Sequence, residues 1–520
     1  MKRSRSLPSV ESAFVTFAVI SLVIILLAAV RGLPTTDGTA VASTGGGVRP
    51  GTAAAGGTAA GAGGTDAVAG TDGALVDNGG GGAGGASGGG GGAGGLTDAE
   101  TAQCASGQNG GSTDSGVSGD RIKLGATVVE SGIGASFLGP VRLGISAVSK
   151  QVNAAGGICG RQLDVVLKDD GWDRQRGRGF IQNLVEDEGV FALAVVPSSE
   201  GLDAAADYID SKGIPVVGTD GLLASQYTHG WIWPVATSTL STMHVMAQDA
   251  YNRGARNFSI VYDRKFRFGL EGAYAFNEAV KRLTGSDIPG YSDPFSSPKC
   301  QSRFCGIQAG ASSYNAEAQV LSDGCSAGVT GSAQPCDFNA LLLEPSEALT
   351  WYNSGGPPVS QFVAGGKGAG AAQPLFTRDF AQNCQAPCDK LVVWTGFNPP
   401  IERFASTTGV AKYVSDVQAE SANADVNNQF LEGGYLGMQL LVEGLRQSGP
   451  NLTRDRLKAV LDSITFDAGL TRPLTWANGR FANTAAQGFQ IGYQGSFNGW
   501  REFTQGFIDD PWVGQDVRTG

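Results

Sequence analysis

Two serines and a glutamate stand where a strand-like run meets a helix-like run. Ser198, Ser199 and Glu200 follow the apolar run Ala192–Val196 and open a helical pattern that ends near Gly213. Hydroxyl groups and free backbone N–H groups at a helix start bind a carboxylate, because the helix dipole places partial positive charge there. The alternative is an ordinary serine cap with Glu200 in the first turn. These residues mark either a site for a small anionic or zwitterionic ligand or a simple helix start.

The sequence after residue 98 offers little for catalysis. It contains no GxSxG elbow, P-loop, HExxH motif or full GxGxxG pattern. The only histidines, His229 and His244, have no recognisable acid or nucleophile partner in the sequence, so we interpret them as core or surface residues. We therefore predict that the protein is not an enzyme and carries no cofactor.

All eight cysteines follow residue 100, and their even number is typical of an oxidising compartment. Proximity in the sequence predicts the disulfides Cys300–Cys305, Cys325–Cys336 and Cys384–Cys388, which leaves Cys104–Cys159. The alternative is a metal site. It is disfavoured because no CxxC pair occurs and neither histidine is close to the cysteines in sequence.

Strand-like and helix-like runs alternate from Arg121 onward. The strand-like runs are 121–129, 161–170, 192–196, 214–218, 258–262, 338–344 and 391–396, with a final pair at 489–494 and 499–504. Helical patterns cover 137–157, 201–213, 241–253, 270–283 and 429–447, and a Cys- and Ser-rich excursion covers 294–335. This alternation predicts an α/β protein with parallel sheets covered by helices on both faces. The number of strands indicates two lobes.

Several of these segments resemble a known family. RIKLGATVVESG (121–132), NAAGGICGRQLDVVLKDD (153–170), VVPSSEG (195–201) and PLTWANGRF (473–481) resemble type I periplasmic solute-binding proteins, in particular the leucine/isoleucine/valine-binding group of ABC transporter receptors. The resemblance runs in order from Arg121 to about Phe503. It implies two Rossmann-like lobes joined by a three-strand hinge, one built from 121–238 plus 398–482 and the other from 239–397 plus 483–520.

The resemblance also implies ligand contacts. Ser199, with Ser198 beside it, would hold a carboxylate, and Asp379 in the other lobe would receive an ammonium group. Phe137, Phe268 and Phe430 match positions that surround the ligand. The alternatives are core packing for the phenylalanines and a solvated loop for Asp379, paired with Arg378.

Two positions depart from the family pattern. Leu222 falls where related proteins have a threonine that helps to hold the carboxylate, although Thr219 or Asp220 nearby could substitute for it. Glu344 falls where an aromatic residue is seen. These changes allow a ligand with more positive charge, or one that lacks an α-carboxylate.

The sequence of the N-terminal region predicts a membrane anchor followed by a disordered tether. Basic residues in 1–12 precede the uncharged run 13–30, which would just span a bilayer and leave the short N-terminus in the cytoplasm. The alternative is a cleaved signal sequence, with a secreted product. The segment 31–103 is rich in Gly and Ala and predicts a disordered tether.

Together these features predict an extracytoplasmic solute-binding protein. It would capture a small polar metabolite, such as an amino acid or a related compound, between two closing lobes and deliver it to the permease of an ABC-type importer. The alternatives are a membrane-tethered sensor without a transport role and a ligand-insensitive scaffold whose cleft its own side chains fill. The net charge of −11 argues against nucleic acid as a partner.

Overall fold

The computed structural model describes residues 96–326, 334–363, 367–493, 495 and 497–518. The predicted cytoplasmic segment 1–12, the membrane span 13–30 and most of the predicted tether lie outside these residues. Among the helices in the described ranges, none is both long and apolar enough to cross a bilayer.

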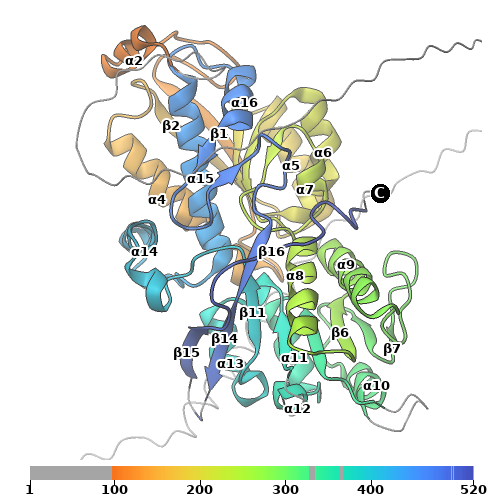
Figure 1. Ribbon diagram of the computed structural model, residues 1–520. Helices are drawn as coiled ribbons and strands as arrows, with labels where there is room; N and C mark the ends of the chain where they lie inside the picture. Colours follow the sequence, from red (N-terminus) through yellow and green to blue (C-terminus); the bar gives the residue numbers. More distant parts are fainter. Residues whose placement is uncertain (1–95, 327–333, 364–366, 494, 496, 519–520) are drawn as a thin grey trace, which may run out of the picture. The chain divides into compact units, whose positions relative to one another are not determined.

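Five parallel strands form the first sheet, in the order β2-β1-β3-β4-β5 (Figure 1). They are β1 (Arg121–Val128), β2 (Gln162–Asp169), β3 (Ala192–Val196), β4 (Val216–Thr219) and β5 (Ile232–Trp233). Every residue of β3 is buried, as expected for a parallel strand with helices on both faces. This sheet is the core of the first lobe.

Six helices accompany the first sheet. They are α4 (Val141–Ala154), α5 (Arg174–Glu186), α6 (Ser199–Lys212), α14 (Thr408–Glu420), α15 (Gln429–Ser448) and α16 (Arg454–Ser463). α15 packs on α4, β3 and β4, whereas α5 packs on α6 and β1. Two glycines let α15 approach the sheet, because a Cβ on Gly218 of β4 would lie 2.4 Å from the Cα of Gly437.

Nine strands form the second sheet, with the path β15-β14-β11-β10-β9-β6-β8-β7 and β16 paired to β14. They are β6 (Phe258–Asp263), β7 (Cys300–Gln301), β8 (Phe304–Ile307), β9 (Phe338–Leu342), β10 (Ala369–Ala371), β11 (Val392–Thr395), β14 (Ala485–Tyr493), β15 (Phe497–Glu502) and β16 (Ile508–Asp509). The predicted parallel sheet is confirmed for β8, β6, β9, β10 and β11, whereas β7, β14, β15 and β16 pair antiparallel. The C-terminal strands form a hairpin that extends the sheet beyond its βα units.

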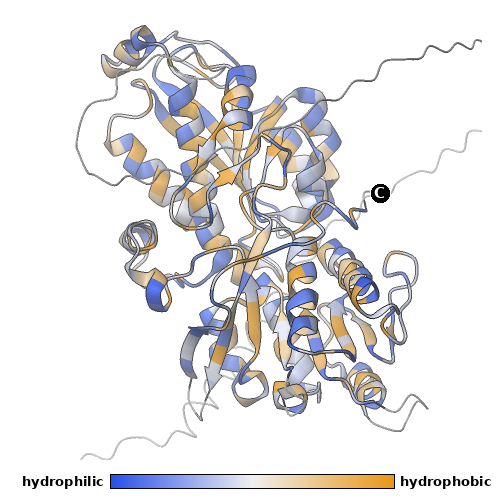
Figure 2. Cartoon of the chain, viewed as in Figure 1, coloured by the Kyte–Doolittle hydropathy of each residue, from blue (hydrophilic) through white to orange (hydrophobic). Residues whose placement is uncertain are grey.

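Six helices accompany the second sheet, and apolar residues gather along its strands (Figure 2). They are α8 (Thr239–Asn252), α9 (Arg267–Thr284), α10 (Asn315–Cys325), α11 (Pro345–Asn353), α12 (Val359–Val363) and α13 (Arg378–Cys384). The short elements are α2 (Asp98–Ala105), α3 (Ala135–Leu138), α7 (Ser225–Thr228), η1 (Gln373–Leu375), η2 (Ala386–Cys388), η3 (Glu402–Ser406), β12 (Thr465–Phe466) and β13 (Leu474–Thr475). The excursion over 294–335 is not featureless, since it contains β7, β8 and α10.

Three passages of the chain between the two sheets are bonded to one another. The amide nitrogen of Asn483 donates to the carbonyl oxygens of Val235 and Gly396, at 3.2 Å each. Thr237 Oγ1 donates to the carbonyl of Ala485 at 2.9 Å. These segments adjoin the lobe boundaries that the resemblance implies.

The folded part begins earlier than the tether prediction allowed. Asp98–Ala105 is a helix whose N-cap, Thr97, forms a reciprocal capping box with Glu100. Cys104 of this helix is bonded to Cys159. The tether assigned to 31–103 was therefore wrong at its C-terminal end, because a low-complexity run hides the capping signal that follows it.

All eight cysteines are paired as predicted from proximity. Besides Cys104–Cys159, the disulfides are Cys300–Cys305, Cys325–Cys336 and Cys384–Cys388. The first joins α2 to the turn before β2, and the second joins β7 to β8. Within the described ranges no group of three or more His, Cys, Asp and Glu residues is placed to hold a metal ion.

Candidate ligand-binding cleft

The two serines lie at the carboxyl edge of the first sheet, between β3 and α6. Both are fully buried. Ser198 is the N-cap residue of α6, but its side chain makes no capping hydrogen bond. Glu200 turns instead to the other lobe, where its carboxylate accepts the backbone N–H of Arg267 at 2.8 Å. The simple helix-cap interpretation therefore does not hold, because Ser198 makes no capping bond and Glu200 contacts the second lobe.

Trp172, which sequence reasoning did not single out, contacts Ser199 and the second lobe together. Its indole Nε1 donates to Ser199 Oγ at 3.0 Å. Its ring stacks on Phe266, just before α9, with ring centroids 4.1 Å apart, and it is only 2% exposed. Trp172 thus donates to the hydroxyl that the resemblance assigns to a ligand carboxylate, and it leaves the O–H of that hydroxyl able to donate.

The backbone holds Trp172 in an unusual conformation. Its φ is 63°, in the left-handed region that bulky residues avoid. Gly171 before it has φ 59°, and the Trp172 N–H donates to Asp170 Oδ1 at 2.9 Å. Backbone strain of this kind clusters at ligand clamps and switches. The only signal in the sequence is the DDGW turn after a predicted strand.

Asp220 lies beside the same helix start, at the end of β4. Its Oδ1 accepts the N–H of Leu222 at 3.1 Å and a bond from the Gln226 amide. Burial raises the pKa of its carboxyl to about 7, against hydrogen bonds from Gln226, Leu222 and Ser199 that lower it. Leu222 itself is fully buried in the apolar core.

Polar contacts tie the lobes together along this edge. Glu271 of α9 accepts the N–H of Ala224 at 2.7 Å and the Nε of Arg267 at 2.6 Å. Gln373 Nε2 donates to the Asp220 carbonyl at 3.2 Å. The Ala224–Glu271 and Gln373–Asp220 bonds and the Trp172–Phe266 stack connect the parts of the chain around the two sheets.

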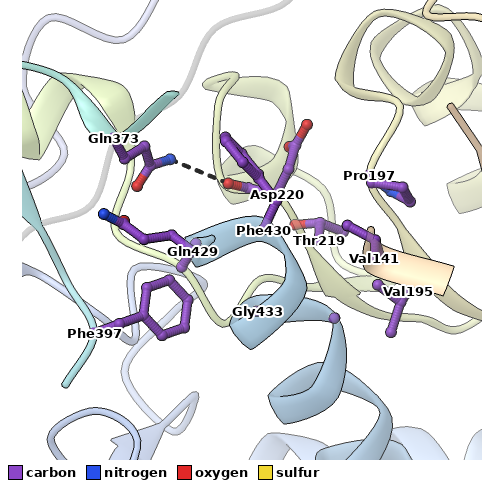
Figure 3. Close-up of a pocket in the computed structure, with 12 residues that line it drawn as sticks. Val141, Val195, Pro197, Thr219, Asp220, Gln373, Phe397, Gln429, Phe430 and Gly433 are labelled. Atoms are coloured by element: carbon purple, nitrogen blue, oxygen red, sulfur yellow. Dashed lines mark hydrogen bonds between the residues drawn. The ribbon is translucent and has the colours of Figure 1, made fainter. Parts of the chain in front are cut away.

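A pocket lies between the lobes and the hinge (Figure 3). Its polar lining residues are Thr219, Asp220, Gln373 and Gln429, and its larger apolar ones are Val141, Val195, Pro197, Phe397 and Phe430. Figure 3 shows the amide groups of Gln373 and Gln429 on the same side of the pocket, near the Phe397 ring. About 10 Å³ remains for the centre of a water molecule, which is room for about one water.

Three carboxyls meet at the corresponding edge of the second sheet. Asp263 ends β6, while Glu344 and Glu347 lie at the start of α11. Glu344 is the N-cap of α11 and accepts the N–H groups of Ser346 and Glu347. Burial comes first among the causes that raise the pKa values of all three carboxyls. Glu344 therefore has a local structural role besides the ligand contact predicted for it.

The remaining predicted contacts fall into two groups. Phe137, Phe268 and Phe430 are buried, and Phe137 lies between Trp172 and Phe430, with centroid distances of 5.5 and 5.4 Å. The Asp379 side chain is 80% exposed and lies 3.7 Å from Arg378 Nε. Of the nine predicted ligand contacts, only Asp220 and Phe430 line the pocket.

His244 belongs to a different part of the fold. Its Nδ1 lies 3.0 Å from Asp510 Oδ1 and its Nε2 lies 2.9 Å from Asp516 Oδ2. Desolvation lowers the pKa of its imidazole, but the two carboxylates outweigh it and raise the pKa overall. His229 lies 3.2 Å from Asp207 Oδ1 at the surface. Neither histidine lines the pocket.

Replacing Trp172 with phenylalanine tests the contribution of the hydrogen bond from Trp172 to Ser199. Trp172→Phe keeps an aromatic ring for Phe266 but loses the donor to Ser199, so the free energy of unfolding should fall by about 1 kcal/mol in urea denaturation. Ser199→Ala is the matched variant, and the double variant should lose little more than either single one. Additive losses would show that the two side chains act independently.

Comparison with known proteins agrees with this architecture. Residues 121–300 match the family described as periplasmic binding protein. No curated protein matches the sequence. A fatty acid ABC transporter substrate-binding protein from Thermomonospora curvata is 16% identical, with a TM-score of 0.61, and the match covers 78% of this chain and 95% of that one.

Two further solved structures share the fold. An ABC transporter solute-binding protein from R. palustris in complex with 4-hydroxybenzoate is 14% identical, with a TM-score of 0.59 and coverage of 76% of this chain and 99% of that one. A branched-chain amino acid transporter substrate-binding protein from Streptococcus pneumoniae in complex with isoleucine is 15% identical, with a TM-score of 0.55 and coverage of 74% and 99%. The ligands named for the three differ, so the shared fold does not specify one.

Proposed function

We propose that this chain, a type I periplasmic binding protein, captures a small molecule between its two lobes and delivers it to an ABC-type importer. The observation that carries the proposal is the pocket at the hinge, whose lining comes from both lobes and from the passages between them. Asp220 and Gln429 belong to the first lobe, Gln373 to the second, and Phe397 follows β11. A site built in this way is complete only when the lobes are closed.

The contacts between the lobes support a cycle of opening and closing. Most are hydrogen bonds from backbone N–H groups or amides, such as Arg267 N–H to Glu200 and Ala224 N–H to Glu271. Water can replace such bonds when the lobes part, at a modest net cost for each bond. The hinge passages are bonded to one another and can stay together during the movement.

We assign the predicted site residues as follows. Asp220 and Phe430 contact the ligand, while Ser198, Ser199, Phe137 and Phe268 form the aromatic and hydroxyl wall beside it. Leu222 supports the loop after β4, and Glu344 supports the start of α11. Asp379 is exposed in the closed arrangement and is proposed to meet a ligand only in the open one.

We further propose that 13–30 anchors the chain in the membrane and that the Gly/Ala-rich segment tethers the lobes near the transporter. A tether raises the local concentration of the binding lobes at the importer. N-terminal sequencing of protein extracted from membranes tests whether the segment is retained.

Thermal unfolding of the full chain with a ligand panel tests the binding role. A ligand at about 100 times its Kd should add about 2.7 kcal/mol to the stability of the folded state and raise Tm. The panel comprises amino acids, fatty acids, aromatic acids, amides, ureas and polyamines. A midpoint unchanged by every class would favour a ligand-insensitive scaffold and overturn the proposed function.

A further inference from the structure

The site that would hold a ligand carboxylate is already occupied by the chain itself. Ser199 Oγ accepts the indole N–H of Trp172 at 3.0 Å. The carboxyl of Asp220 lies at the same helix start, where hydrogen bonds from the N–H and the hydroxyl of Ser199 lower its pKa. The Asp220 carboxyl at this helix start disfavours a ligand carboxylate there, because the two groups would compete for the same N–H and O–H donors and because like charges repel.

The pocket behind this position contains amide groups without partners. Both polar atoms of Gln429 and Oε1 of Gln373 have no hydrogen-bond partner among the described residues. Gln429 is 1% exposed and Gln373 is 3% exposed, so water does not satisfy them freely. Each unpaired buried polar atom destabilises the folded chain, because it has lost its water without gaining a partner. A bound molecule with both donors and acceptors would remove that cost.

The pocket lining carries little charge. Within the described residues that line it, there is no lysine, arginine or histidine, and Asp220 is the single acidic group. A ligand carboxylate would therefore be buried in this pocket without a cation to pair with it, which is unfavourable. The rest of the wall is apolar, with Val141, Val195, Phe397 and Phe430 suited to a short alkyl or ring body.

We propose that the hinge pocket binds a small uncharged molecule with a carboxamide or urea-type head and an apolar body. Its carbonyl accepts from Gln429 Nε2, its N–H groups donate to the free amide oxygens of Gln373 and Gln429, and its apolar part contacts Phe397 and Phe430. This inference rests on the proposed function and names the ligand class of the same site. Because the pocket now has room for about one water, the lobes must part slightly to admit such a ligand, while the Trp172–Ser199 bond lies within the first lobe and stays in place.

Three molecules of the same shape and different charge test the class. Isobutyramide, isobutyrate and isobutyramidinium differ in their head group and carry charges of 0, −1 and +1. In calorimetric titrations of the full chain at pH 7, isobutyramide should bind at least about tenfold more tightly than either charged analogue. An isobutyrate or isobutyramidinium affinity equal to or above that of isobutyramide would overturn the inference.

A pair of glutamine variants places the binding in the pocket. Gln429→Leu should weaken isobutyramide binding at least about tenfold, because the head group loses both amide partners on α15. Gln439→Leu, on the same helix but in a separate groove, should leave the affinity unchanged. Equal losses in both variants, or none in Gln429→Leu, would overturn the assignment.

The ligand panel separates this inference from the proposed function. If none of the three isobutyryl molecules binds while an amino acid or a fatty acid does, the ligand class is wrong and the binding role stands. If nothing in the panel binds, the proposed function falls and the inference falls with it.

Discussion

The Gly396→Ala variant is expected to unfold with a free energy about 3 kcal/mol lower than that of the native chain. Gly396 lies in the hinge, directly after β11. A Cβ at this position would stand 1.9 Å from Thr237 Oγ1 and 2.9 Å from the Asn483 amide nitrogen. Both neighbours are buried and bonded to other hinge passages, so neither can move without breaking a hydrogen bond. Overpacking costs about 1–3 kcal/mol, and a broken buried bond adds about 1 kcal/mol.

Urea denaturation of the full chain measures this effect against a matched control. Gly179→Ala introduces the same methyl group inside α5, where nothing lies within 4 Å, and should raise stability by about 0.5–1 kcal/mol. The double variant Gly396→Ala/Thr237→Ala should recover part of the loss, because it removes the hydroxyl oxygen that clashes. A Gly396→Ala curve that coincides with the native one would show that the hinge passages are not tightly packed.

Local sequence patterns predicted most of the first lobe. The runs 121–129 and 192–196 are largely apolar and are followed by helical patterns, and the structure confirms them as β1 and β3. The run 161–170 is confirmed as β2 although most of its residues are not buried, and the helix α5 that follows it was not predicted. The helix at 429–447 is confirmed as α15 within one residue at its C-terminal end. A strand such as β3 is predictable because burial on both faces requires a continuous apolar run.

Sequence reasoning did worse where a contact depends on the meeting of two lobes. Trp172 stacks on Phe266, which is 94 positions away, and no local pattern encodes that neighbour. Gln373 and Gln429 look like surface glutamines in the sequence, yet they share one pocket. The DDGW turn is the one local feature that accompanies the left-handed backbone at Gly171 and Trp172, and it does not show where the Trp172 ring lies.

The folded chain is expected to be more stable at pH 5 than at pH 8 by at least about 2 kcal/mol, with Asp263 as a main cause. Burial raises the pKa of Asp263 from its ordinary 3.8 to about 7, and nearby Glu344 adds to the rise. Glu347 is buried beside it, and neither of its oxygens has a partner in the described ranges. Burial and Asp263 raise the pKa of Glu347 as well. Lys265 opposes these shifts only in part.

The free energy of unfolding falls with rising pH because the folded state holds protons that the unfolded state has already released. Between about pH 4 and pH 7 the folded chain keeps a proton on Asp263 that the unfolded chain has released, so stability falls as the pH rises through this window. Above about pH 7 both states are ionised and the loss is complete. Burial also raises the pKa values of Asp220 and Glu271 to about 7, so both act in the same direction.

Asp263→Asn isolates the contribution of this carboxyl. Oδ1 of Asp263 accepts the N–H of Lys265 at 2.6 Å, which an asparagine oxygen can replace, whereas Oδ2 has no partner within the described part of the chain. The variant should therefore raise the free energy of unfolding at pH 8 by about 2 kcal/mol and shrink the difference between pH 5 and pH 8 by as much. The exposed Asp455→Asn, in the first turn of α16, is the control and should leave the difference between pH 5 and pH 8 unchanged. Urea denaturation from pH 5 to pH 8 measures both, and an Asp263→Asn profile as steep as the native one would place the pH dependence elsewhere.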